Sequence, residues 1–143
     1  MDSFQTFIGK EEIPVLFHVF SSQEERRTFG GSAFLELQFC TLPSGTAPEE
    51  LVSIDNITHW KNDSLYIQDE NAFYREYGRI FRCGLYNNLR RGPVDVYGIN
   101  YYAPCSIAPI LEAIRQNQPA DHEITAEWLN RAKAYNGFYI LGI

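Results

Sequence analysis

Histidine and cysteine are the residues of this sequence whose types best suit metal binding or covalent catalysis. The histidines are His18, His59 and His122, and none stands at the H-x-x-x-H spacing that places two ring nitrogens on one helix face. No cysteine lies within a few residues of a histidine, and no C-x-x-C pair occurs. Because tetrahedral zinc ligands usually come in close local pairs, we expect no metal centre.

A catalytic cysteine needs a base beside it and a lowered thiol pKa, so each thiol is judged by its neighbours. Cys105 comes near the expected start of a helix, where the macrodipole favours a thiolate, and Cys83 lies among arginines. Either thiol would need His59 or His122 beside it, which the spacing leaves open. A small hydrolase using Cys83 or Cys105 is therefore an alternative, although buried free cysteines explain the pattern more simply.

Motifs that bind nucleotides or activate a serine do not occur in the chain. The sequence has no G-x-x-x-x-G-K-[ST], G-x-G-x-x-G or G-x-S-x-G. Its carboxylate pairs, at 11–12, 24–25 and 49–50, are adjacent, and adjacent side chains in a strand or helix point in different directions. These pairs are typical of a solvated surface, so we expect a binding protein without a cofactor rather than an enzyme.

The clearest positional feature is a reversal of charge between residues 76 and 79. The segment 49–76 carries seven acidic residues and two basic ones, whereas 79–91 carries four arginines and no acidic residue. Clustered carboxylates speed association with a basic partner, and tyrosine adds contact area at low entropic cost. We therefore interpret the acidic segment as the candidate partner-binding surface, formed by Asp63, Tyr66, Asp69, Glu70, Tyr74 and Glu76.

Two explanations fit the arginine block, which comprises Arg79, Arg82, Arg90 and Arg91. With aromatic residues interleaved, it is typical of a surface that contacts phosphates and stacks bases, as in an RNA-binding module. The acidic segment beside it would repel a polyanion, and Glu76 precedes Arg79 by three residues, within reach on a helix. The sequence therefore favours internal ion pairs, with RNA binding as the weaker alternative.

Strands are predicted where apolar residues run together or alternate. A continuous apolar run covers 15–20, and at 33–40 an apolar face of Ala33, Leu35, Leu37 and Phe39 alternates with a partly wet one. Residues 57–60 and 65–67 predict a hairpin around a turn at 61–64. Further strands are predicted at 79–83, 94–102 and 138–143, with a polar loop over 84–92. The last is expected at a sheet edge, where it can pair with another chain.

Helices are predicted where apolar residues recur every three or four positions behind a capping residue. A short one starts at 48–51, and Asp69 caps another that carries Phe73 and Tyr77 on one face and stops at Gly78. A third contains Ile107, Ile110, Leu111 and Ile114 and is broken at 117–119. Asp121 caps a fourth, ended by Asn136-Gly137, with inward positions Ile124, Trp128, Leu129, Ala132 and Tyr135.

Length and composition predict one domain over residues 1–143. Hydrophobic residues make up 45% of the chain and the net charge is −6, which argues against general affinity for nucleic acid or an anionic membrane. Strands, then two helices and a strand, predict an α+β fold with a mostly antiparallel sheet and helices packed on one face. Three widely spaced cysteines and the lack of a signal or membrane segment predict a cytoplasmic protein.

The C-terminal half combines residues 84–88 and 92–102, two helices, and a tyrosine- and glycine-rich end at 135–143. In this general character it resembles the immunity proteins (antitoxins) of bacterial polymorphic toxin systems, including those of contact-dependent growth inhibition. The resemblance implies a small cytoplasmic protein that binds and neutralises one cognate toxin domain, commonly a nuclease, by masking its active or essential surface. It assigns no contact residue, and the acidic segment would then imitate nucleic acid in the toxin's phosphate-binding cleft.

Overall fold

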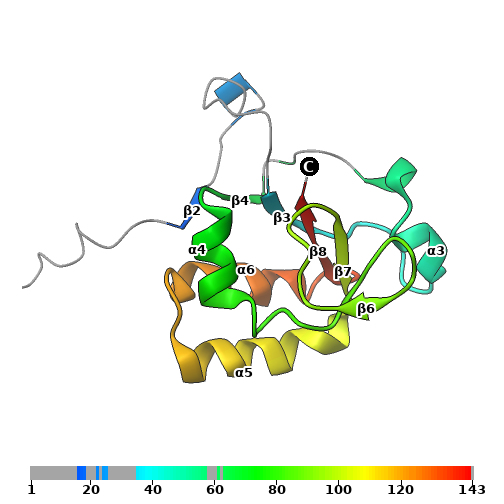
Figure 1. Ribbon diagram of the computed structural model, residues 1–143. Coiled ribbons are helices and arrows are strands. Elements are labelled where there is room, and N and C mark those ends of the chain that lie inside the picture. The colour runs from blue at the N-terminus through cyan, green and yellow to red at the C-terminus, as the bar shows by residue number, and fades with distance from the viewer. Residues whose placement is uncertain are drawn as a thin grey trace, which may run out of the picture.

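Seven strands form one sheet in the part of the chain that this computed structural model describes, residues 16–18, 22, 24–25, 35–57, 61 and 63–142 (Figure 1). Every neighbouring pair of strands is antiparallel. Across the sheet the order is β2 (Phe17–His18), β4 (Leu65–Ile67), β3 (Leu35–Phe39), β8 (Phe138–Gly142), β7 (Ile99–Tyr102), β5 (Gly84–Leu85) and β6 (Arg91–Gly92). With the helices that pack on it, this sheet confirms the predicted α+β fold.

Three helices cover one face of the sheet: α4 (Glu70–Tyr77), α5 (Ile107–Asn117) and α6 (His122–Ala132) (Figure 1). Every second residue of a strand points to the same face. On β3 these residues are Leu35, Leu37 and Phe39, and they share one apolar core with side chains of the three helices, including Phe73, Ile114 and Trp128. The helices therefore lie on one face of the sheet, as predicted.

The opposite face is covered near its centre by α3 (Pro48–Leu51), whereas the following 3-10 turn η1 (Ile54–Asn56) has no buried residue. Leu51 and Val52 pack there against strand residues such as Tyr139, whose hydroxyl donates to the Leu51 carbonyl at 2.5 Å. This face of β3 was expected to be partly wet, and that expectation is wrong. Its residues Glu36, Gln38 and Cys40 are 1%, 2% and 0% exposed.

The C-terminal strand β8 lies inside the sheet and not at its edge. It pairs with β3 over five residues on one side and with β7 over four on the other. The predicted strand is therefore confirmed, but its predicted edge position is wrong. Because both edges of β8 are hydrogen-bonded, it offers no free edge for another chain.

The helix signals located α4 and α5 correctly. The side chain of Asp69 accepts a hydrogen bond from the Ala72 backbone N–H at 3.1 Å, which is the expected cap. Phe73 and Tyr77 are both fully buried. In α5 the buried residues are Ile107, Ile110 and Ile114, and the helix ends at Gln118, which adopts the left-handed conformation with φ +45°.

Helix α6 begins where predicted, but it ends at Ala132, before the predicted Asn136-Gly137, and Tyr135, predicted to face inward, lies beyond it and is 38% exposed. Two other predicted positions also differ. Asp121 precedes the helix without capping it through its side chain, and its Oδ2 accepts from the backbone N–H groups of Leu16 and Phe17. Asp121 therefore ties β2 to the start of α6. Ile124, predicted to face inward, is 39% exposed, and its neighbour Thr125 is fully buried and hydrogen-bonded to the Tyr77 hydroxyl at 2.8 Å.

Three predictions for residues 79–102 need correction. The segment 79–83 is no strand, because the N–H groups of Ile80 and Phe81 donate to the Tyr77 carbonyl at 2.9 and 3.1 Å and turn the chain. The region expected to be a polar loop contains the short pair β5 and β6. The strand predicted at 94–102 is shortened to β7, because Asn100 binds the backbone of Asp95 through both its Oδ1 and its Nδ2.

The N-terminal half bears out two predictions in part. The strand predicted at 65–67 forms as β4, but it pairs with β2 on one side and β3 on the other, so the hairpin predicted with 57–60 is wrong. β2 lies within the apolar run predicted at 15–20. The rest of that run, and most of the first arm of the hairpin predicted at 57–67, fall outside the described residues, as do Ala33 and Phe34. The short helix predicted at 48–51 is confirmed as α3.

Gly137 is expected to be intolerant of a side chain. It has a φ of +84°, and a Cβ at this position would lie 2.1 Å from the Tyr102 carbonyl oxygen. We expect Gly137→Ala to lower the free energy of unfolding by about 2 to 4 kcal/mol, measured by urea denaturation. Gly45→Ala is the matched control, because Gly45 also has a positive φ, +90°, but nothing lies within 4 Å of its Cβ position. Equal losses in the two variants would contradict the steric explanation.

Candidate partner-binding surface

Tyr97 and Glu70 form the centre of a polar and aromatic surface in the described part of the chain. Tyr97 lies in the turn before β7 and is 72% exposed. Its hydroxyl donates to Glu70 Oε1 in the first turn of α4 at 3.1 Å. This hydrogen bond to a carboxylate raises the pKa of the Tyr97 phenol, because the charged acceptor favours the protonated donor.

Two further residues of α4 extend this surface. Asp69 is exposed at the N-cap, and Tyr74, which is 50% exposed, stands four residues after Glu70 and so on the same side of the helix. We call Asp69, Glu70, Tyr74 and Tyr97 the α4 acidic surface. Three of its four members belong to the predicted site, and Tyr97 was missed.

Glu76 has a structural role in the same helix. Its Oε1 accepts from the Ala120 backbone N–H at 2.9 Å, and its Oε2 lies 3.9 Å from Arg75 Nε. The first contact ties the end of α4 to the connection between α5 and α6. Glu76 is therefore half-buried and points away from a partner that would contact Tyr74.

The remaining predicted residues, Asp63 and Tyr66, lie apart from the α4 acidic surface. The Asp63 carbonyl accepts from Trp128 Nε1 at 2.8 Å, and its Oδ1 is buried with no hydrogen-bond partner among the described residues. Tyr66 lies between the core residues Leu65 and Ile67, so it points to the sheet face opposite α4. The structure thus gathers Asp69, Glu70 and Tyr74, and it separates Asp63, Tyr66 and Glu76 from them.

The arginine block is not neutralised by internal ion pairs. Within the described residues, none of its four arginines lies within 4.0 Å of a carboxylate oxygen, and the expected pair of Glu76 with Arg79 is not formed. Arg91 instead donates to the Cys83 carbonyl at 3.3 Å. The favoured explanation by internal pairing is therefore wrong, because α4 ends at Tyr77 and the helical spacing does not continue to Arg79.

The thiols differ in exposure. Cys40 is buried, whereas Cys83 and Cys105 are exposed, so the interpretation of all three as buried thiols is wrong for two. Among the described side chains, no hydrogen bond joins Cys83 or Cys105 to a histidine. Cys105 precedes α5, and His122 follows the far end of that 11-residue helix, about 16 Å along its axis. A Cys105–His122 couple is therefore not formed, and His59 lies outside the described residues.

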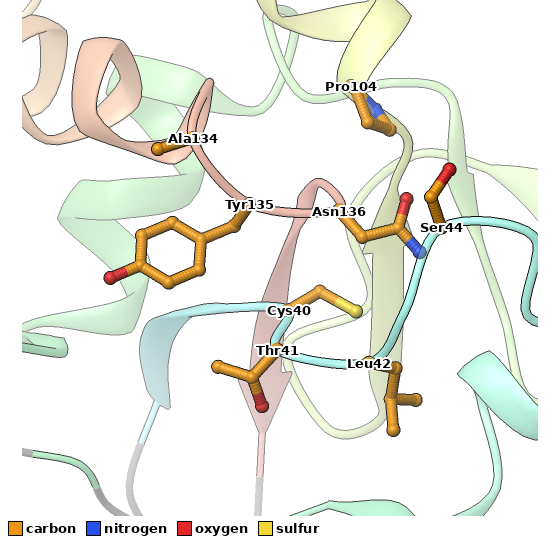
Figure 2. A pocket seen from close by; sticks show the side chains of 8 residues that line it. All are labelled: Cys40, Thr41, Leu42, Ser44, Pro104, Ala134, Tyr135 and Asn136. Atoms are coloured by element: carbon orange, nitrogen blue, oxygen red, sulfur yellow. The ribbon is translucent and has the colours of Figure 1, made fainter.

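A pocket of about 420 Å³ lies where the end of β3 meets the turn after α6 (Figure 2). Figure 2 shows Cys40, Ser44 and Asn136 on one side of it and the Tyr135 ring on the other. Several of its polar groups already have partners: Asn136 Nδ2 donates to the Pro43 carbonyl at 3.0 Å, and Cys40 Sγ donates to the Tyr139 hydroxyl at 3.6 Å. This hydrogen bonding holds the loop after β3 in place.

The described residues contain no group of three or more His, Cys, Asp or Glu that could hold a metal ion. None of the helices in this part of the chain has the length and apolar character needed to cross a membrane. No protein-family model matches the chain, and neither a curated protein nor a solved structure matches it.

Proposed function

We propose that this chain is a cytoplasmic immunity protein that binds a cognate bacterial toxin domain and masks its active or essential surface. The observation that supports this proposal is the α4 acidic surface, where two carboxylates lie beside two exposed tyrosines. Exposed aromatic side chains next to charged groups are typical of residues that dominate binding energy at interfaces. The C-terminal resemblance to immunity proteins supplies the class of partner.

The chemistry of this surface favours a basic partner. Asp69 and Glu70 lie at the start of α4, and the chain as a whole carries a net charge of −6, so association with a cationic protein is accelerated. The hydrogen bond from Tyr97 to Glu70 orders both side chains before binding, which lowers the entropic cost of forming the interface. A nuclease toxin, whose substrate is a polyanion, has the required positive cleft.

The test uses the toxin domain encoded by the reading frame that precedes the gene for this chain. Asp69→Asn with Glu70→Gln removes both charges and keeps a residue that can cap α4. We expect this double variant, combined with Tyr97→Ala, to weaken binding at least 100-fold in calorimetry and to abolish protection of cells that express the toxin. Binding by the native chain is expected to weaken as salt is raised.

The matched control is Glu123→Gln with Glu127→Gln. These carboxylates are exposed on α6, so the control makes the same charge change outside the proposed interface. It should bind and protect like the native chain. Unchanged binding by the Asp69, Glu70 and Tyr97 variant would rule out the α4 acidic surface, and a preceding gene that encodes no toxin domain would count against the proposed function itself.

A further inference from the structure

The turn between α4 and β5 holds two arginines at the protein surface. Phe81 is fully buried, with its ring centroid 5.6 Å from that of Tyr102 and 6.1 Å from that of Phe138. The backbone hydrogen bonds from Ile80 and Phe81 to the Tyr77 carbonyl hold the same turn at its other end. Arg79 and Arg82, on either side of this anchored segment, are both exposed. Their backbone is therefore fixed while their side chains face outward.

A pocket of about 370 Å³ lies between this turn and the first half of α5, and we call it the Arg79–Arg82 pocket. Its polar lining includes Arg79, Arg82 and Cys83, and its apolar lining includes Ile80, Ile110 and Ala113. The volume falls within the range of small-ligand sites, roughly 300 to 1,000 Å³. Arg79 and Arg82 also line a second pocket of about 390 Å³ beside Tyr74 and Pro93.

The charge of this site is uncompensated. Among the described residues, neither Arg79 nor Arg82 has an ion pair or a side-chain hydrogen bond, although the chain as a whole is acidic. Two neighbouring guanidinium groups repel each other, and an anion between them would relieve that repulsion. The planar fork of arginine matches the two oxygens of a carboxylate, and the apolar wall beside it favours a hydrophobic group on the same molecule.

We propose that the Arg79–Arg82 pocket binds an apolar carboxylate. The carboxylate lies against the two guanidinium groups, and the hydrophobic body of the ligand lies against Ile80, Ile110 and Ala113. The site is at the C-terminal end of α4, whereas the Asp69 and Glu70 carboxylates of the α4 acidic surface are at its N-terminal end. Its test uses a small ligand and no toxin domain, so its failure can be distinguished from failure of the proposed immunity function.

The probe is 4-phenylbutyrate, and its uncharged analogue 4-phenylbutanamide is the matched ligand. We expect the carboxylate to bind with a dissociation constant on the order of 1 mM, because a ligand of this size gains only modest affinity. Chemical-shift titration measures this binding. The amide should bind at least 10-fold more weakly. Absence of carboxylate binding at 20 mM, or equal binding of the amide, would overturn the proposal.

Variants of the chain test whether 4-phenylbutyrate binds in the Arg79–Arg82 pocket. Arg79→Gln with Arg82→Gln should weaken binding of 4-phenylbutyrate at least 10-fold. Ala113→Phe should abolish its binding by filling the pocket. Arg90→Gln with Lys133→Gln removes two charges from exposed positions that do not line the pocket, and it should bind like the native chain. Circular dichroism checks that each variant is folded. Undiminished binding by the Arg79 and Arg82 variant would place the ligand elsewhere and overturn the proposal.

The cysteines provide a second readout in the native chain. Cys83 lines the pocket, whereas Cys105 does not. Saturating 4-phenylbutyrate should slow alkylation of Cys83 by iodoacetamide at least threefold and leave the rate at Cys105 unchanged, as measured by peptide mass spectrometry. Equal rates at Cys83 with and without the ligand would contradict occupation of this pocket.

Discussion

Replacing Phe39 with alanine is expected to lower the free energy of unfolding by about 3 to 5 kcal/mol. The Phe39 ring lies between Trp128 and Tyr135, with centroid distances of 4.2 and 4.5 Å and an angle of 6° between planes in both pairs. Arg131 adds a cation over the same ring, 5.3 Å from its centroid. Truncation leaves a cavity under α6 and removes these contacts together. Urea denaturation of the native and variant chains measures the loss.

Two variants make this prediction decisive even if Phe39→Ala does not fold. Phe39→Leu keeps most of the volume but loses the stacking, so we expect a smaller loss of about 1 to 2 kcal/mol. Tyr97→Ala removes an aromatic ring of similar size that is 72% exposed, and we expect a change within about 0.5 kcal/mol. A loss at Phe39→Ala no larger than at Tyr97→Ala would contradict a structural role for the ring stack.

Features that depend on a few neighbouring residues could be predicted from the sequence. The cap at Asp69 and the apolar spacing of α5 are of this kind, because both are set within three or four residues. The strand β8 was also predicted correctly, because a continuous run of apolar and aromatic residues is typical of a strand that is buried on both faces.

Features that depend on distant segments could not be predicted. The alternation of apolar and polar residues in β3 distinguishes the two faces of the strand. It does not show that α3 and the loop after it pack on the second face of the sheet, or that Glu36 and Gln38 are buried there. Likewise, the spacing within α6 does not show that Thr125 forms a hydrogen bond with the Tyr77 hydroxyl. This contact turns Thr125 inward and leaves Ile124 at the surface. The central position of β8 depends on its pairing with β3, about one hundred residues away.

The candidate site likewise combines residues that local sequence predicts with one that depends on a distant contact. Asp69, Glu70 and Tyr74 were predicted because they are close in sequence and lie on one short helix. Tyr97 was missed because the hydrogen bond that joins it to Glu70 spans 27 residues. The only local signal was an aromatic residue within the turn Asp95-Val-Tyr-Gly98, which exposes its side chain because the backbone reverses there.

Above pH 10 the protein is expected to lose stability steeply, because several buried phenols ionise more readily in the unfolded chain. Burial is the largest cause that raises the pKa of Tyr77, Tyr102 and Tyr139, and it raises the pKa of Tyr101 to about 12. An unfolded phenol has a pKa of about 10. Because the folded pKa values are raised, their stabilising contribution is complete below pH 10 and is lost as the pH rises through the folded pKa values.

The slope of stability against pH tests this linkage. Each phenol that ionises only in the unfolded state contributes about 1.4 kcal/mol per pH unit, so four together give about 5 kcal/mol per unit between pH 10.5 and 11.5. Since small domains have only about 5 to 15 kcal/mol of stability, we expect unfolding near pH 11 to 12. Urea denaturation at each pH measures the slope, and Tyr77→Phe should reduce it by about a quarter. Tyrosinate absorbance of the native chain should rise less by pH 11 than that of the same chain in urea. Equal absorbance in the two states would contradict burial of these phenols.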